Sequence, residues 1–181
     1  MRFPRWMGWM LGLMAATMTV AVPARAQLAF YGQFTGTDMG IANTPHLYGG
    51  TFGIYTTKRL GLLALGPDLR GAILKHGSST PNADQELDMG LGGIRLAATP
   101  RVLPVMPYLE VLGGIAYAKT GQGAARQDHF VGAAQFLAGV DYTVIPRIDW
   151  RVVEFSYGRL GSSVGVFNPR TLSTGIVVRL P

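Results

Sequence analysis

The stretch that decides the fold reads MPYLEVLGGIAYA and covers residues 106–118. Successive side chains of an extended strand point to opposite faces, so Leu109, Val111 and Ile115 share one face. The other face carries Glu110 and mostly small residues. A soluble barrel turns its apolar face inward, whereas a transmembrane barrel turns it toward lipid and fills the lumen with small and polar residues. Small residues beside Glu110 suit a narrow lumen, such as that of an eight-stranded barrel, which is only wide enough for side chains. The pattern therefore favours a transmembrane barrel.

Eight such segments follow one another along the chain, and the gaps between them are alternately long and short. We expect strands at Leu28–Thr35, Tyr48–Thr56, Gly61–Lys75, Leu87–Ala98, Met106–Ala118, Phe130–Thr143, Asp149–Arg159 and Thr171–Leu180. The long gaps centre on residues 36–47, 76–86, 119–129 and 160–169, and the short gaps on residues 57–59, 99–104 and 144–148. Tight turns on one side of a bilayer and loops on the other give this rhythm. The sequence therefore predicts an all-β fold, an eight-stranded antiparallel up-and-down transmembrane β-barrel.

Residues 1–26 have the organisation of a cleavable signal peptide. A basic start precedes an apolar run at Met10–Val22, and Ala-Arg-Ala at residues 24–26 has the small-x-small pattern of a cleavage site. We expect cleavage after residue 26 and a barrel domain over residues 27–181. The alternative, an uncleaved anchor, is disfavoured because the apolar run is short for a membrane span.

Composition excludes several classes of function. The expected leader contains Arg2, Arg5 and Arg25, so its removal halves the formal net charge of +6 and leaves no basic cluster of the kind that binds nucleic acid. The chain has no cysteine, which excludes a disulfide scaffold, a thiolate metal site and a cysteine nucleophile. Many of its 25 glycines lie inside apolar stretches, which suits the twist and close packing of a barrel wall.

Two segments depart from the simple pattern. The apolar residues of Leu87–Ala98 change parity between Leu91 and Ile94, which predicts a β-bulge at residues 92–93 that restores one apolar face. Pro67 donates no ladder hydrogen bond, so we expect a bulge or distortion beside it.

Aromatic residues collect where the membrane interfaces are expected. They are Tyr31, Tyr48, Tyr55, Tyr108, Tyr117, Tyr142, Trp150 and Tyr157. Rings with a polar edge favour the headgroup level of a bilayer. Aromatic enrichment is also ordinary in strands, so both interpretations stay open.

Two further stretches carry a resemblance to a known family. PYLEVLGG at residues 107–114, and GVDY at residues 139–142 leading into PRIDWR at residues 146–151, are similar to strands and a tight turn of the eight-stranded outer-membrane β-barrel family, the OmpA-like and OmpX-like barrels. The resemblance covers essentially all of residues 27–181. It implies a monomer in the outer membrane of a Gram-negative-type bacterium, surrounded by outer-membrane lipid and lipopolysaccharide.

The resemblance also implies a topology and a route of assembly. Both ends of the mature chain and the three tight turns face the periplasm, four loops face outward, and the barrel-assembly machinery inserts the chain. Members of the family usually end in an aromatic residue, whereas this sequence ends in Leu180-Pro181. We expect no further domain after the barrel, so peptidoglycan binding is not implied.

Arg95 and Glu110 form the sharpest candidate pair for the lumen. The turn between their strands centres near Leu103, so antiparallel pairing places the two residues opposite each other. The other candidates for a lumenal ion-pair network are Glu154, Asp141, Asp68 and Arg70. Such a network is either an ion gate in a narrow conduction path or a plug that satisfies charges inside a solid barrel. We favour the plug.

The three histidines do not predict a metal site. His46, His76 and His129 each lie at a strand–loop junction, and a metal site requires two or three of them to converge with a carboxylate such as Asp128. We expect solvated loop histidines and no metal or other cofactor.

One set of residues matches a catalytic pattern in type. Lipid A deacylases are also eight-stranded outer-membrane barrels, and they use a His-x-Ser pair with a glutamate; His76, Ser78 and Glu86 supply those residue types here. In that family the motif lies late in the chain, whereas here it lies beside the second long loop. We therefore expect ordinary loop chemistry and assign no catalytic residue.

These observations predict a non-enzymatic outer-membrane barrel with a structural or surface-interaction role through its four outward loops. The alternatives are a narrow pore, a lipid A-modifying barrel enzyme, and a soluble lipocalin-like barrel of the periplasm whose apolar faces point inward.

Overall fold

The computed structural model describes residues 27–40, 46–76, 85–100, 102–120, 127–162 and 165–180, and these residues form nine β-strands. The strands are β1 (Gln27–Asp38), β2 (Leu47–Leu60), β3 (Leu63–His76), β4 (Gln85–Ala98), β5 (Val105–Thr120), β6 (Gln127–Ile145), β7 (Ile148–Ser162), β8 (Gly165–Phe167) and β9 (Arg170–Arg179). The expected signal peptide lies outside the described residues. Within them, no helix is long and apolar enough to cross a bilayer.

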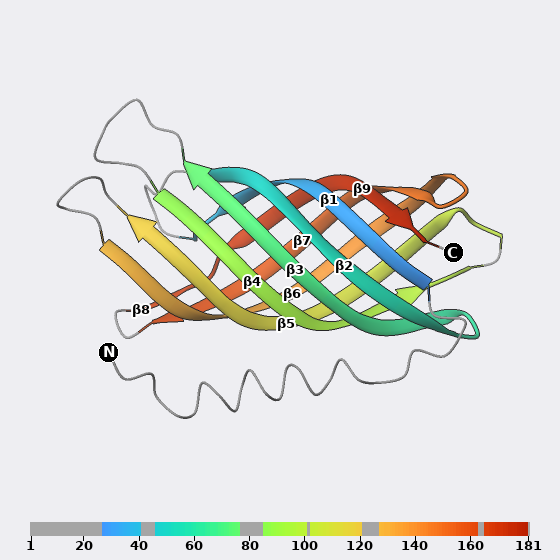
Figure 1. Ribbon diagram of the computed structural model, residues 1–181, viewed down its shortest axis with the longest axis horizontal. Helices are drawn as coiled ribbons and strands as arrows, with labels where there is room; N and C mark the ends of the chain where they lie inside the picture. The colour runs from blue at the N-terminus through green and yellow to red at the C-terminus, as the bar shows by residue number, and fades with distance from the viewer. Residues whose placement is uncertain are drawn as a thin grey trace.

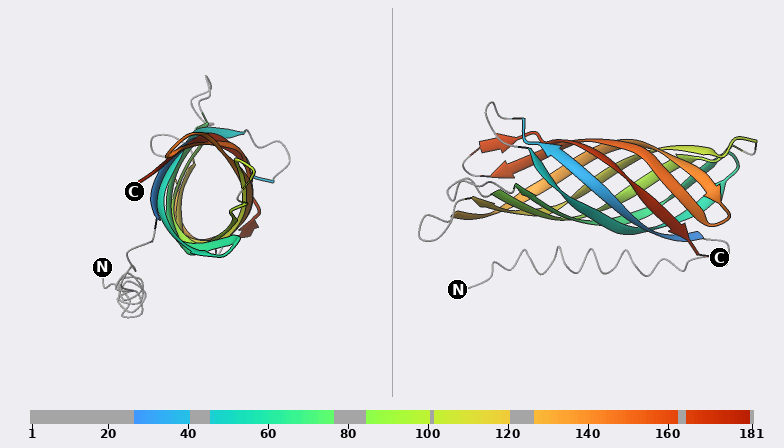
Figure 2. Two further views of the ribbon diagram at one scale, coloured as in Figure 1. Left: turned by 90° about the vertical axis from the view of Figure 1, so that its right-hand side faces the viewer. Right: turned by 90° about the horizontal axis from the view of Figure 1, so that it is seen from above.

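The strands form one closed antiparallel barrel. From β1 to β7 each strand pairs with the next one in the chain. Strand β9 pairs with both β1 and β7 and so closes the wall (Figures 1 and 2). The three-residue strand β8 pairs with the end of β7, so eight long strands make the barrel. The predicted fold class is confirmed.

The three short connections join the strands for which they were predicted, but the alternation of lengths is confirmed only in part, because six residues join β4 to β5 and six join β5 to β6. Strand β2 passes into β3 through Gly61 and Leu62, and β6 into β7 through Pro146 and Arg147. Gly61 and Arg147 have φ angles of 72° and 76°, the left-handed region that such tight turns require. The predicted loop at residues 160–169 differs in part, because β7 runs into it and forms a short hairpin with β8.

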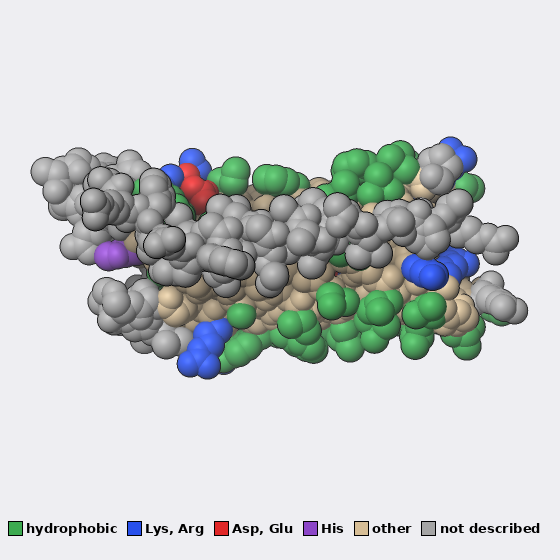
Figure 3. Space-filling view, turned by 60° about the horizontal axis from the view of Figure 1, so that its bottom comes forward, with side chains coloured by type: hydrophobic (Ala, Val, Ile, Leu, Met, Phe, Trp, Pro, Cys, Tyr) green, Lys and Arg blue, Asp and Glu red, His purple; other side chains and the backbone are tan. Residues whose placement is uncertain are grey.

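Apolar side chains cover the outside of the wall. On β5, Val111 is 61% exposed and its neighbour Glu110 is 1% exposed; on β1, Phe34 is 62% exposed and Thr35 is 1% exposed. Hydrophobic side chains run along the outer face, with lysines and arginines toward the two ends (Figure 3). This arrangement is that of a transmembrane barrel, and it excludes the lipocalin-like alternative.

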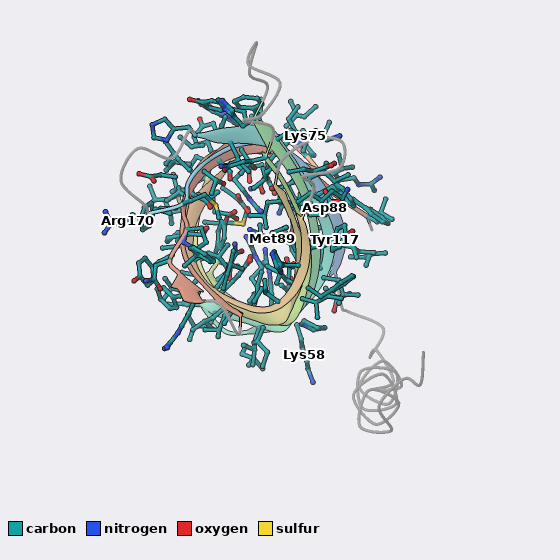
Figure 4. The ribbon with its side chains drawn as sticks, turned by 90° about the vertical axis from the view of Figure 1, so that its left-hand side faces the viewer. Lys58, Lys75, Asp88, Met89, Tyr117 and Arg170 are labelled. Carbon is teal, nitrogen blue, oxygen red and sulfur yellow. The ribbon has the colours of Figure 1, made fainter. Side chains whose placement is uncertain are left out.

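The predicted bulge at residues 92–93 is wrong. Strand β4 pairs with β3 and β5 in one unbroken register across that point. Leu87, Met89 and Leu91 are buried in the lumen, whereas Ile94 points outward; Met89 lies inside the barrel in Figure 4. The strand needs no bulge, because the lumen near the long loops is apolar and accommodates Leu87, Met89 and Leu91.

An unpredicted bulge lies in β7. The pairing of β7 with β9 shifts by one residue between Arg151 and Glu154. The pairing of β7 with β6 shifts by one residue at the same place, opposite Val140 and Asp141. One additional residue reverses the alternation of side chains. Arg151 and Glu154, three positions apart, therefore both point into the lumen.

Pro67 interrupts the ladder between β2 and β3. The pairs stop at Tyr55–Asp68 and resume at Lys58–Leu65 in the same register. The expected distortion is therefore a local gap in the pairing, without a bulge.

The aromatic residues divide between the two faces. Tyr31, Tyr55 and Tyr108 are buried in the lumen, so of the two interpretations left open the interface one does not apply to them. Tyr48, Tyr142, Trp150 and Tyr157 point outward and are between 40% and 52% exposed, as a membrane-interface position requires.

A charge on the outer face of β5 should be costly. We expect Val111→Arg to lower the free energy of unfolding by about 2–4 kcal/mol, because the side chain faces lipid near the middle of its strand. Urea unfolding from lipid vesicles measures the change, with Val111→Leu as the control. An unchanged midpoint for Val111→Arg contradicts the placement of this face in lipid.

Candidate functional site in the barrel lumen

The six residues predicted for a lumenal network all point into the barrel. Asp68 and Arg70 lie on β3, Arg95 on β4, Glu110 on β5, Asp141 on β6 and Glu154 on β7, and each is at most 7% exposed. They come from five consecutive strands. The closed wall therefore brings side chains from distant parts of the sequence to one level of the lumen.

Arg95 contacts Glu110, the partner that the hairpin register predicts. The two residues are opposite each other in the β4–β5 ladder. Arg95 Nη1 donates to Glu110 Oε1 over 2.5 Å, and Arg95 Nη2 donates to Asp141 Oδ2 over 2.6 Å. One guanidinium therefore joins carboxylates from two neighbouring strands.

Two more arginines close these contacts into a ring. Arg151 donates from Nε to Asp141 Oδ1 over 2.8 Å and from Nη1 to Glu154 Oε2 over 3.1 Å. Arg70 donates from Nη1 to Glu154 Oε1 over 2.7 Å and from Nη2 to Glu110 Oε2 over 3.1 Å. We call the closed set the charge ring; its members in order are Arg95, Glu110, Arg70, Glu154, Arg151 and Asp141. Positive and negative groups alternate and are equal in number.

Asp68 lies beside the charge ring. The Tyr31 hydroxyl donates to Asp68 Oδ1 over 2.9 Å and accepts from Arg70 Nε over 3.0 Å. Asp68 Oδ2 is buried and has no hydrogen-bond partner among the described residues. A neutral phenol thus links this fourth carboxylate to the ring.

Tyrosine rings cover the flat faces of the guanidinium groups. The Arg95 guanidinium carbon lies 3.5 Å from the centroid of the Tyr108 ring and 4.4 Å from that of Tyr55. The Arg151 guanidinium carbon lies 4.5 Å from the centroid of Tyr31. Away from water, each such contact contributes on the order of 1–2 kcal/mol. The edges of the arginines therefore meet carboxylates while their faces meet aromatic rings.

Arg151 is the ring member that reasoning from the sequence missed. In a regular strand Arg151 and Glu154 point to opposite faces, so an inward Glu154 places Arg151 in lipid. The bulge in β7 turns both side chains inward. The available signal was the cost of a lipid-facing arginine, which itself indicates a change of phase within the strand.

Apolar side chains fill the lumen between the charge ring and the long loops. We call this cluster the apolar plug; it consists of Leu47, Ala72, Leu74, Leu87, Met89, Leu91, Leu112, Ala116, Val131, Ala133, Leu137 and Leu160. Every member is at most 8% exposed. The lumen at this level is therefore occupied by packed side chains from β2 to β7.

Hydroxyl groups line the side of the lumen formed by β1 and β9. Thr35 Oγ1 lies 2.8 Å from Thr51 Oγ1 and 3.0 Å from Ser173 Oγ, and Thr37 Oγ1 lies 3.2 Å from Thr171 Oγ1. The contacts of Thr35 with Ser173 and of Thr37 with Thr171 cross the seam at which the barrel closes, and Thr35 with Thr51 joins β1 to β2.

The lumen has a second ion pair near the tight turns. Arg179 Nη2 donates to Asp149 Oδ1 over 2.5 Å, and the Thr143 hydroxyl donates to the same carboxylate oxygen over 2.8 Å. Asp149 is fully buried. An ion pair therefore also occupies the lumen on the turn side of the charge ring.

The predicted histidine positions show no metal site. His76 Nδ1 lies 3.0 Å from the backbone oxygen of His46, and His129 is exposed. The side chain of Asp128 lies outside the description. Where side chains are described, none of them form a group of three or more metal-ligating residues.

Ser78 of the deacylase-like set lies outside the described residues, whereas Glu86 lies within them. Glu86 Oε1 is 2.9 Å from Lys75 Nζ, and Glu86 Oε2 is 3.0 Å from Lys119 Nζ. Both carboxylate oxygens therefore face lysines from neighbouring strands, which opposes a role for Glu86 in orienting His76.

Solved structures of bacterial outer-membrane proteins have the same fold. Neisserial surface protein A is 18% identical with a TM-score of 0.59, over 86% of this chain and 97% of that one. Ail of Yersinia pestis is 12% identical with a TM-score of 0.53, over 86% and 97% of the two chains. A major outer membrane protein from Thermus thermophilus is 9% identical with a TM-score of 0.53, over 86% and 100%.

No protein-family model matches the chain, and no curated protein matches it significantly. At the identities of the solved structures the likeness shows the fold alone. The chain has the fold of the outer-membrane β-barrels, which is the architecture that the sequence resemblance implied.

Removing one acid from the charge ring should be strongly destabilising. Glu110→Ala leaves Arg95 and Arg70 each without one carboxylate partner in a closed interior, and breaking a buried pair costs about 3–5 kcal/mol. Urea unfolding from lipid vesicles measures this loss. Glu86→Ala is the control, because an ion pair on the outer rim contributes about 1 kcal/mol or less. Equal midpoints for Glu110→Ala and the unaltered chain contradict the ring's structural role.

Proposed function

We propose that the chain is a non-enzymatic, non-conducting barrel of the bacterial outer membrane, whose role is structural or depends on surface contacts made by its four long loops. The observation that carries this proposal is the filled lumen. The fold and its outer-membrane neighbours support the location.

The apolar plug and the charge ring lie one after the other along the barrel axis. An ion that entered from the loop side would meet packed leucines such as Leu87 and Leu137, both at most 1% exposed. Beyond them it would meet guanidinium groups whose donors already bind carboxylates on several strands. Opening a path requires breaking several ion pairs at once, so the arrangement supports a plug rather than a gate.

The contacts also favour a non-enzymatic barrel. The buried carboxylates Glu110, Asp141 and Glu154 each accept hydrogen bonds from two arginines, so they serve as fixed partners rather than as groups facing a substrate. Glu86 is held by two lysines on the outer surface. The alternative of a lipid A-modifying enzyme requires these contacts to be replaced.

The connection between β3 and β4, with the rim beneath it, favours hydrogen-bonded contacts over strong charge attraction. Residues 77–84 read GSSTPNAD, which is polar and nearly uncharged. At the rim below them Lys75 and Lys119 are balanced by Glu86 and Asp88. Ail has been solved in complex with the heparin analogue sucrose octasulfate. On this side of the rim the balanced charges instead suit lipopolysaccharide sugars or other neutral polar surfaces, while exposed Arg159 and Arg170 add positive charge on β7 and β9.

Planar-bilayer recording tests the absence of conduction. We expect the purified chain to give no discrete current steps, while a general porin reconstituted in parallel gives them. Steps that appear with the unaltered chain, and change in size with Glu110→Gln, would establish a conducting path through the charge ring and reject the proposal.

Mass spectrometry of lipid A tests the enzymatic alternative. Membranes containing the unaltered chain and membranes containing Ser78→Ala should yield the same lipid A species, since no catalytic step is proposed. A lipid A product that depends on Ser78 would contradict the non-enzymatic assignment.

A further inference from the structure

An apolar groove crosses the outer wall in the half of the barrel that carries the tight turns. It has a volume of about 510 Å³ and is lined by residues of β3 to β7. Its sides are formed by Leu63, Leu96 and Leu109 on one side and by Val153 and Phe155 on the other. The groove lies on the face that the fold turns toward lipid.

The groove follows from the sizes of side chains along one row of the sheet. Leu96 pairs with Leu109, Leu109 with Ala138, and Ala138 with Phe155. Leu109 and Phe155 are 46% and 50% exposed, so both project from the wall. Ala138 between them has only a methyl group. Large side chains therefore project from β5 and β7, and the surface is depressed over β6 between them.

An aromatic pair lies toward the tight turn, beyond the groove on the same two strands. Tyr142 follows Val140 on the outer face of β6, and Trp150 precedes Val153 on the outer face of β7. Tyr142 and Trp150 are ladder partners and are 40% and 48% exposed. Rings with a polar edge are favoured near the headgroup level, and Val144 and Ile145, 57% and 52% exposed, extend the apolar surface beyond this pair.

A cation follows the aromatic pair. Arg147 lies in the tight turn between β6 and β7 and is exposed. From the groove toward the turn, the surface thus passes over the aromatic pair and the exposed apolar side chains of Val144 and Ile145, and ends at a positive charge. A phospholipid has the same two ends: an acyl chain at one and a phosphate at the other.

We propose that this surface binds one phospholipid with an anionic headgroup, whose acyl chain lies in the groove over Ala138 and whose phosphate meets Arg147. The lipid belongs to the leaflet on the tight-turn side. The raised side chains on both sides of Ala138 restrict one chain more than a flat wall does, which distinguishes bound lipid from the surrounding bilayer. The proposal depends on the transmembrane fold and not on the function of the loops.

Native mass spectrometry of the full protein tests the groove. The protein is purified from its membrane, equilibrated in detergent with phosphatidylglycerol, and scored for the fraction that retains one lipid. Ala138→Leu fills the floor of the groove and should reduce retention about tenfold, because several methylene contacts are lost. Ala134→Leu is the matched control, since it adds the same side chain to the outer face of the same strand four residues away and should retain lipid as the unaltered chain does.

A second substitution addresses the headgroup. Arg147 has a positive φ, which asparagine tolerates well, so Arg147→Asn removes the charge with little strain on the turn. It should abolish the preference for phosphatidylglycerol over phosphatidylcholine in a mixed sample. Circular dichroism before each measurement establishes that the variants are folded, and Ala98→Leu, which fills the same groove from β4, replaces Ala138→Leu if that variant fails to fold.

Each result decides one part of the proposal. Equal retention by the unaltered chain, Ala138→Leu and Ala134→Leu rejects the groove as a binding site, and so does equal loss in both leucine variants. An unchanged headgroup preference in Arg147→Asn rejects the role of the arginine. A lipid-independent dimer that disappears with Ala138→Leu would show that a second copy of the chain, not a lipid, occupies the groove.

Discussion

The charge ring is the interaction on which the interior of this barrel depends. A closed sheet of eight strands leaves a space that side chains must fill, and half of the residues of every strand point into it. Isolated charges in such a space are costly, because the attraction of a pair must offset the loss of water around both groups. Alternation of three guanidinium groups with three carboxylates gives each charge two opposite neighbours. Tyrosine rings then occupy the faces of the guanidinium groups that carry no hydrogen-bond donors.

The lumen is divided into two unlike parts, and this division explains the behaviour of β4. Toward the long loops its inward residues are leucines and a methionine, and toward the tight turns they are Arg95 and alanine. An apolar outer wall alone does not require an apolar interior. The apolar plug adds the kind of packing found in soluble proteins to a barrel whose outside already faces lipid.

Local regularities of the sequence were sufficient for much of the architecture. Two-residue alternation and the spacing of turns predicted the strands, the connectivity and the outward apolar face. The Arg95–Glu110 contact followed from the register of one hairpin, which a short turn fixes. Contacts between strands that do not pair with each other, such as Arg70 with Glu154, depend on the closed wall. The register of a single hairpin could not predict them.

The errors have a common physical cause. Parity distinguishes the two faces of a strand but does not show which face meets lipid when both carry apolar residues, so Leu87 and Met89 were assigned to the wrong side. For the same reason, the sequence could not decide between an interface and a lumenal position for Tyr31, Tyr55 and Tyr108. The bulge in β7 has one signature in sequence, the cost of an Arg151 that faces lipid, and that signature can be read only once Glu154 has been assigned to the lumen.

The position of the charge ring relative to the closing seam has a consequence for the order of assembly. All six ring members belong to β3 through β7, whereas the wall closes where β1 meets β9. At that seam short hydroxyl side chains face one another across the lumen side, as Thr35 does with Ser173. A curled, still open sheet of the five central strands therefore already contains every ionic partner within the charge ring. The last two edges can meet without carrying an unpaired ring charge through the bilayer.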